Sequence, residues 1–148
     1  MFSNNRISEA LAQVANIAPV SQAAGAVSTG WVSVKNLHML LAIVNTGVLG
    51  VSATVDAKLQ QATDGAGTGA KDITGKAITQ IVKATGDNKQ ALINLRPQEL
   101  DTNANFSFVR LTITVGTAAS LISADLLGFP RNLPADTANQ AAVVQVVA

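Results

Sequence analysis

The chain has no cysteine, no tyrosine, one histidine and one tryptophan among its 148 residues. Without cysteine, neither a disulfide framework nor a thiolate metal site can form. The basic residues are scattered singly from Arg6 to Arg131, and the formal net charge is only +1. Because nucleic-acid binding needs a clustered basic surface, we expect no nucleic acid among the partners.

Charged side chains are scarce as well. They make up 13% of the chain, against roughly 25% in an average soluble domain. With 48% hydrophobic residues, such a chain is expected to leave apolar surface for contacts with other chains. An ordinary alanine-rich monomer would have the same composition, so composition alone leaves both interpretations open.

The sequence offers little for a catalytic, cofactor or metal site. The single histidine, His38, has no nearby carboxylate at ligand spacing. Because the chain has no second imidazole and no thiol, no His-based triad and no zinc cluster can be assembled except around this one residue. The stretch Gly65 to Lys71 resembles a phosphate loop but lacks the Gly-Lys-Ser/Thr ending, which favours a turn. Glu99 and Asp101 form a possible carboxylate pair, more typical of a solvated loop. We therefore expect no enzyme, no cofactor and no metal.

Membrane segments are not indicated either. The N-terminal sequence MFSNNRISEALAQ lacks the basic region and apolar core of a signal peptide. Leu37 to Val55 is long enough for a membrane span, but polar residues and two glycines interrupt it. Two strands joined at Thr46 to Gly50 explain this stretch better, and we expect no membrane partner.

The strongest structural signal is the stretch from Val51 to Lys71. Apolar residues from Val51 to Leu59 alternate with polar ones, which is typical of a half-buried β-strand. Three glycines at 65, 67 and 69 follow, and a second segment begins at Ile73. This pattern predicts a hairpin in an antiparallel sheet.

The second half of the chain continues the strand pattern. Residues 91–95 and 107–115 alternate, and 121–127 and 141–147 are apolar stretches. Seven or eight short strands separated by turn signals predict an all-β fold, an antiparallel β-sandwich or jelly roll in a single domain. Its core is expected to contain Val55, Leu59, Val109, Leu111 and Ile113.

Two sets of residues are candidates for protein contacts. Phe106, Phe108 and Arg110 share one strand face and could form an aromatic and guanidinium surface, or could fill space beneath a loop. Near the C-terminus, β-branched residues favour addition of a strand to another sheet: Val143, Val144, Val146 and Val147. We expect an N-terminal arm over residues 1–30, the sandwich over 31–134, and a C-terminal arm or last strand over 135–148.

Several segments carry a family resemblance, and they are Trp31-Val-Ser-Val, Ala42-Ile-Val with Gly47, VDAKLQQATD (55–64), GAKDI (69–73), GKAIT (75–79), DNKQ (87–90), Glu99-Leu-Asp and FSFVR (106–110). Together they resemble a family of small structural proteins of tailed bacteriophages, most of all head decoration, or cement, proteins. The similarity spans Trp31 to Pro134.

This resemblance implies a virion location on the capsid exterior, a β-sandwich or jelly-roll fold, a homo-oligomer that is often a trimer, and the major capsid protein as partner. A head-to-tail connector or tail-terminator-like protein is the alternative within the same class. A β-sandwich that binds a small ligand or a glycan is a further alternative, although the chain has few aromatic residues for a sugar platform.

Overall fold

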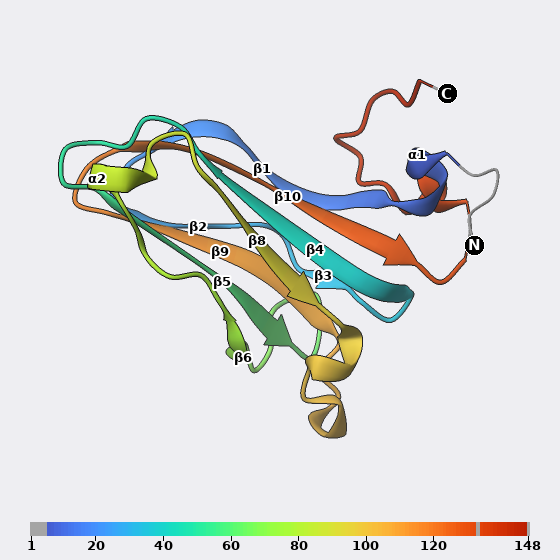
Figure 1. The fold of residues 1–148 in the computed structure, drawn as a ribbon. Helices are drawn as coiled ribbons and strands as arrows, with labels where there is room; N and C mark the ends of the chain where they lie inside the picture. The colour runs from blue at the N-terminus through green and yellow to red at the C-terminus, as the bar shows by residue number, and fades with distance from the viewer. Residues whose placement is uncertain (1–5, 133, 148) are drawn as a thin grey trace.

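The computed structural model describes residues 6–132 and 134–147 and consists of two antiparallel sheets packed face to face (Figure 1). In chain order the elements are α1 (Ile7–Ala10), β1 (Ala12–Gln22), β2 (Gly25–Ser28), β3 (Val32–Ser33), β4 (Leu37–Thr46), β5 (Thr54–Ala62), β6 (Lys71–Ala77), β7 (Ile81–Val82), α2 (Lys83–Gly86), β8 (Gln90–Leu95), η1 (Pro97–Glu99), η2 (Thr102–Ala104), β9 (Phe108–Gly116), β10 (Ser120–Pro130) and η3 (Ala135–Ala138). None of the described helices has the length and apolar character needed to cross a bilayer.

The strand order is that of a jelly roll. Sheet A has the order β1-β10-β4-β8, and sheet B has the order β2-β9-β5-β6, with β3 paired to β9 and β7 paired to β5. The first and last long strands are therefore neighbours in one sheet, and the chain changes sheet repeatedly, as in two Greek keys. The all-β, antiparallel sandwich or jelly roll expected from the sequence is confirmed.

The core lies between the two sheets and is built by the inward half of each alternating strand. All five predicted core residues, Val55, Leu59, Val109, Leu111 and Ile113, are completely buried. They meet apolar residues of sheet A that alternate in the same way along β4, β8 and β10. Burial of one face of each sheet against the other is what fixes the strand register.

The predicted hairpin is present, with one shift at its start. Strand β5 pairs with β6 across the glycine-rich turn, as the alternation indicated. Val51, however, is 81% exposed, because the chain turns there before β5 begins at Thr54. The preceding strand β4 ends at Thr46, so the expected break within 37–55 is also observed, and it carries the chain from sheet A to sheet B.

Residues 12–28, predicted as part of an N-terminal arm, belong instead to the two sheets. Strand β1 pairs with β10 in sheet A, and β2 pairs with β9 in sheet B. Residues 7–10 form the short helix α1, and the strand that pairs with β10 begins at Ala12. The sandwich thus begins near residue 12 instead of at 31. After η3, the C-terminal segment, defined here as residues 139–147, contains no regular strand among its described residues.

Candidate protein-contact surfaces

The first predicted contact set lies on the outer side of sheet B. Phe108 and Arg110 alternate with buried residues of β9, and Phe106 precedes that strand. All three are half-buried. The guanidinium carbon of Arg110 lies 4.6 Å from the ring centroid of Trp31, and Nζ of Lys71 lies 4.4 Å from that of Phe106. Each ring of these two pairs therefore already has a cation against it.

The glycine-rich loop, residues 63–70, lies on these rings. A Cβ at Gly67 would be 2.5 Å from Nε1 of Trp31, and one at Gly65 would be 3.5 Å from Phe108. Gly67 also has a φ of +86°, which other residues rarely adopt. The rings of Trp31 and Phe108 thus lie beneath a loop. This favours the alternative, considered from the sequence, that the aromatic residues fill space under a loop. Its role in contacts with another protein stays a prediction.

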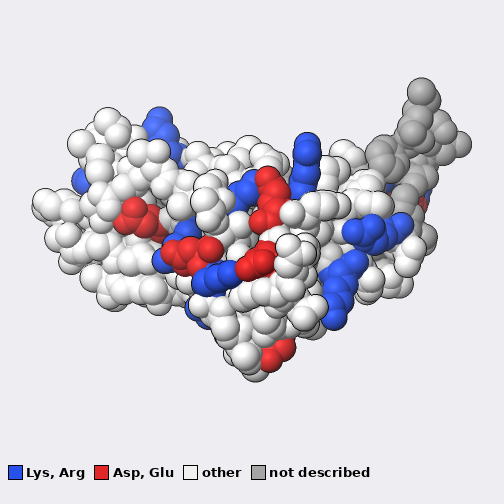
Figure 2. Space-filling model, turned by 90° about the horizontal axis from the view of Figure 1, so that it is seen from below, with Lys and Arg blue, Asp and Glu red and all other residues white. Residues whose placement is uncertain are grey.

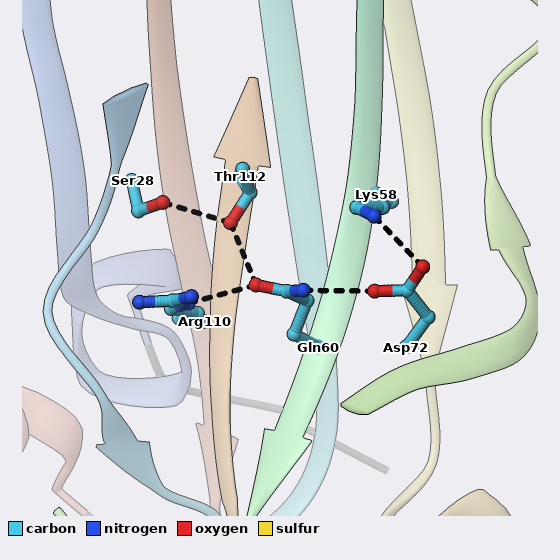
Figure 3. A network of polar contacts seen from close by, with 6 residues as sticks. All are labelled: Ser28, Lys58, Gln60, Asp72, Arg110 and Thr112. Atoms are coloured by element: carbon cyan, nitrogen blue, oxygen red, sulfur yellow. Dashed lines mark hydrogen bonds and ion pairs between the residues drawn. The ribbon is translucent and has the colours of Figure 1, made fainter. Parts of the chain in front are cut away.

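A hydrogen-bonded network runs across the outer side of sheet B (Figure 3). Oε1 of Gln60 accepts hydrogen bonds from Nε of Arg110 at 2.9 Å and from Oγ1 of Thr112 at 3.1 Å. The hydroxyls of Thr112 and Ser28 are 2.8 Å apart. These side chains come from β2, β9 and β5, so the network ties three adjacent strands together on the outer side.

The same network continues to β6 through a carboxylate. Asp72 accepts hydrogen bonds from Nζ of Lys58 at 2.7 Å and from Nε2 of Gln60 at 2.8 Å. The bond from Lys58, followed by that from Gln60, holds the pKa of Asp72 below its ordinary value. On this side of the molecule, charges are therefore paired with near neighbours.

Other acidic residues near sheet B have lysine partners of their own. Lys71 pairs with Asp101 at 2.7 Å, and Lys76 pairs with Glu99 at 2.8 Å. The two carboxylates singled out from the sequence are thus held by separate cations. Figure 2, seen from the side of sheet B, shows acidic and basic residues interspersed over the middle of this surface.

Sheet A is almost uncharged by comparison. Within its described strands the one charged residue is Asp125. The strands of sheet B contain six: Asp56, Lys58, Lys71, Asp72, Lys76 and Arg110.

Apolar residues occupy the outer side of sheet A, which sequence reasoning did not single out. These apolar residues, called the sheet A patch below, are Met39, Leu41, Ile43, Leu92 and Leu127. Strand pairing sets Ile43 beside Leu92 and Leu41 beside Leu127, so the patch is continuous across β8, β4 and β10. Leu92 is 60% exposed and Met39 is 50% exposed.

Amide side chains surround the sheet A patch. They are Gln13, Asn16, Asn45, Gln90 and Asn94, which lie at register positions on its outer rows. The carboxylate of Asp125 sits between Ile43 and Asn16 in the register and accepts a hydrogen bond from Nε2 of Gln13 at 2.6 Å. Much of the border of the patch is thus polar and uncharged, but Lys76, Arg96 and Glu99 lie beside Met39.

His38 lies beside the patch, in β4. It is exposed, and its ring centroid is 5.8 Å from that of Phe129. This ring contact is compatible with the structural role expected from the sequence. Within the described residues, no group of three or more His, Cys, Asp or Glu side chains could hold a metal ion.

Two hollows flank the sheet A patch. One, of about 400 Å³, is lined by Val20, Asn45 and Leu121 among others. The other, of about 290 Å³, lies between Leu127 and the C-terminal segment, which contributes Val143 and Val146. The outer side of sheet A therefore carries apolar hollows at both ends.

The C-terminal segment starts with backbone contacts to the edge of sheet A. The amide of Gln140 donates to the carbonyl of Gln13 at 2.8 Å, and the amide of Gln13 donates to Oδ1 of Asn139 at 2.8 Å. Beyond these bonds the segment is largely exposed, with Val144 at 94% and Val147 at 83%. The four C-terminal valines predicted as contacts thus remain accessible, and their binding role stays a prediction.

A signal for the sheet A patch exists in the sequence. Residues 40–44 are apolar without alternation, and Leu92 is apolar between the inward Ala91 and Ile93. A strand that is apolar on both sides is normally covered on both sides. Only the pairing of β4 with β8 and β10, however, shows that these residues join into one surface.

The fold and these surfaces define a jelly roll with one polar and one apolar outer side. No family model and no curated protein matches the chain. Among solved structures, a chain of broad bean stain virus matches with 10% identity and a TM-score of 0.46, covering 84% of this chain and 86% of that one. A chain of the cowpea mosaic virus top component matches with 10% identity and a TM-score of 0.44, covering 84% and 87%.

A third match comes from a different kind of protein. The C-terminal family 22 carbohydrate-binding module of Clostridium thermocellum Xyn10B has 13% identity and a TM-score of 0.41, covering 88% of this chain and 91% of that one. Since jelly rolls occur in proteins of unrelated function, matches at these low TM-scores carry no inference about activity or partners.

Proposed function

We propose that the protein is a structural component of a virus particle, a capsid decoration protein that binds the outside of the shell formed by the major capsid protein. In this proposal it works as a homo-oligomer and is not an enzyme. It adds contacts between shell subunits and so stabilises the particle.

The observation that carries the proposal is the sheet A patch. Apolar side chains and amides make up most of the outer side of sheet A, with Leu92 more than half exposed. Contiguous apolar surface of this kind marks a place where another protein chain binds. A rigid jelly roll with one surface suited to be covered by another chain fits a protein that functions as part of an assembly.

The resemblance of residues 31–134 to phage structural proteins supports the same proposal. It also suggests that the particle is that of a tailed bacteriophage. The pairing of Glu99 with Lys76 and of Asp101 with Lys71 supports a non-enzymatic role, since each of these carboxylates is engaged in holding a loop. The glycan-binding alternative is weakened by Trp31, whose ring is already contacted by Arg110 and Gly67 and is not an open platform for a sugar.

The test is the number of copies per intact particle, measured by quantitative mass spectrometry against the major capsid protein. A decoration protein is expected at a number comparable to that of the shell subunits, whereas a connector or tail-terminator protein is expected as a single ring. Adding the purified protein to particles that lack it should restore that number and raise the temperature at which the shell opens. Absence from particles would overturn the proposal.

A further inference from the structure

We infer that the sheet A patch is the site at which a second copy of this chain packs, face to face about a twofold axis. This inference specifies the homo-oligomer of the proposed function and rests on it. The other occupant to be considered is the surface of a different protein, such as a shell subunit.

Self-complementary chemistry on the border of the patch favours a second copy. An amide side chain both donates and accepts hydrogen bonds, so Asn and Gln on one copy can pair with Asn and Gln on another. A border of lysines or of carboxylates would instead match only a surface of opposite charge. Most polar residues placed around the sheet A patch are amides or hydroxyls. The exceptions are Asp125, His38 and, beside Met39, the group Lys76, Arg96 and Glu99.

Asp125 does not prevent this packing. Its carboxylate already accepts a hydrogen bond from Gln13 of the same chain, which lowers the cost of covering it. The amides of a second copy can supply further donors. From the strands of sheet A, two opposed surfaces therefore bring together two hydrogen-bonded carboxylates and no other charged residue. Of the charges beside Met39, Lys76 and Glu99 are paired with each other, so like-charge repulsion is small.

The free edges of the sheets are poor alternatives for association. On the β8 edge, Nζ of Lys76 donates to the carbonyl of Asn94 at 2.7 Å. On the β1 edge, Pro19 has no amide hydrogen, and Gln13 is engaged by Gln140. In sheet B, the β2 and β3 strands have only 4 and 2 residues. Lysines, proline and short edge strands are common protections against edge-to-edge pairing, which leaves the sheet A surface for contact.

The area of the outer side of sheet A, of which the sheet A patch is a part, indicates a weak contact. Four strands at about 4.8 Å spacing, each contributing about seven residues of roughly 3.3 Å, give this side an area of about 440 Å² in plan. A standard interface buries about 800 Å² on each partner. We therefore expect dissociation constants in the micromolar range or weaker, with the pair favoured where many copies are concentrated on one particle.

Sedimentation velocity of the purified protein from about 10 µM to about 1 mM tests the inference. We expect a two-subunit mass at high concentration, with little dependence on salt because few charges are involved. Leu92→Lys places a charge in the contact and should weaken association at least about tenfold. Thr114→Lys, the matched control, adds the same charge on the outer side of sheet B and should leave association unchanged.

A mixing experiment separates a contact effect from a folding defect. Leu92→Lys and Leu92→Glu should each be monomeric alone, with circular dichroism spectra like that of the wild type, and should associate when mixed. Recovery in the mixture is expected only if two sheet A surfaces face each other. A monomer up to about 1 mM, a three-subunit mass, or equal weakening by Thr114→Lys would overturn the inference.

Failure of this inference is distinguishable from failure of the proposed function. A wild-type protein that stays monomeric but still binds particles at high copy number would overturn the twofold contact and leave decoration intact. A protein that dimerises through sheet A but is absent from particles would overturn decoration alone. The trimer expected from the sequence resemblance would need two different contact surfaces, and the native mass decides between the two.

Discussion

The two sheets share one core but differ on their outer sides. Sheet B carries six charged residues in its strands and links several of them with uncharged neighbours into the network around Gln60. Sheet A carries one charged residue, Asp125, and exposes leucine, isoleucine and methionine. The inward residues of both sheets are the same in kind, so the fold alone does not explain the difference.

This difference separates what folding requires from what association requires. The outer side of sheet B is already satisfied within one chain, because its donors and acceptors meet each other across strands. The outer side of sheet A gains from being covered, because its exposed apolar area remains in water in a single copy. The proposed association thus depends on the outward residues of sheet A and not on the core.

The largest expected effect distinguishes inward from outward leucines. Leu111→Ala should lower the free energy of unfolding by about 2–5 kcal/mol, because the residue is fully buried between the sheets and leaves a cavity. Leu92→Ala, on the outer side of sheet A, should cost less than about 0.5 kcal/mol in the monomer. Urea unfolding measures both. Similar losses at the two positions would show that Leu92 serves the fold and not a contact.

A second comparison tests the loop that covers the rings on sheet B. Gly67→Ala introduces both a strained φ and a Cβ 2.5 Å from Trp31, and should cost roughly 2–3 kcal/mol. Gly75→Ala is the matched control, since its φ is +74° but a Cβ there would meet no atom within 4 Å. It should cost about 1 kcal/mol.

Tryptophan fluorescence sharpens this comparison, because Trp31 is the only tryptophan. Its emission should change in the folded Gly67→Ala variant and stay constant in Gly75→Ala. Equal destabilisation by the two variants, with unchanged emission, would mean that the loop does not press on the indole.

The inward pattern was readable from the sequence and the outward surface was not. Val55, Leu59 and Val109 were placed in the core because alternation reports which face of a strand is dry. Alternation cannot report which strands become neighbours, so Leu92 and Ile43, far apart in sequence, could not be recognised as one surface. Strand β1 was missed for the same reason, because its partner β10 lies at the other end of the chain.

Local chemistry was predicted unevenly. The turn at residues 63–70 followed from its glycines, yet the reason for their spacing, contact with Trp31 and Phe108, depends on packing between distant segments. Likewise, Glu99 and Asp101 were correctly expected in a loop between strands, but their separate lysine partners come from β6. Long-range contacts thus account for most of what sequence reasoning left out.

A smaller effect is expected on acidification, and it should come from the side of sheet B. Hydrogen bonds from lysines hold the pKa values of Asp72 and Glu99 below their ordinary values. Since the unfolded chain then binds protons first as pH falls, this contribution is complete above about pH 6. It is lost progressively as the pH falls from about 5 through the lowered pKa values of the folded state. Each pair is exposed, so the loss should stay under about 1 kcal/mol and decrease with added salt.

Substitutions identify the source of that acid dependence. Asp72→Asn and Lys58→Gln should both flatten the decline of stability between about pH 5 and pH 3. Lys89→Gln, which removes a lysine outside the ion pairs of the described residues, should not. If all three variants keep the wild-type slope, the pairs on sheet B contribute nothing measurable to folding.

The smallest expected effect on folding is that of removing the end of the chain next to sheet A. Deleting residues 141–148 leaves the bonds of Asn139 and Gln140 to Gln13 in place, so the free energy of unfolding should change by less than about 0.5 kcal/mol. The same deletion removes the exposed valines that line the hollow beside Leu127, and should weaken attachment to particles or to a second copy.

Deleting residues 139–148 also removes the bonds of Asn139 and Gln140 to Gln13 and is expected to cost about 1 kcal/mol more. The two deletions together separate the role of these bonds in folding from the role of the valines in binding. If the shorter deletion saturates particles with unchanged affinity, the valines have no binding role, and recognition by the apolar side of the molecule depends on the sheet A patch.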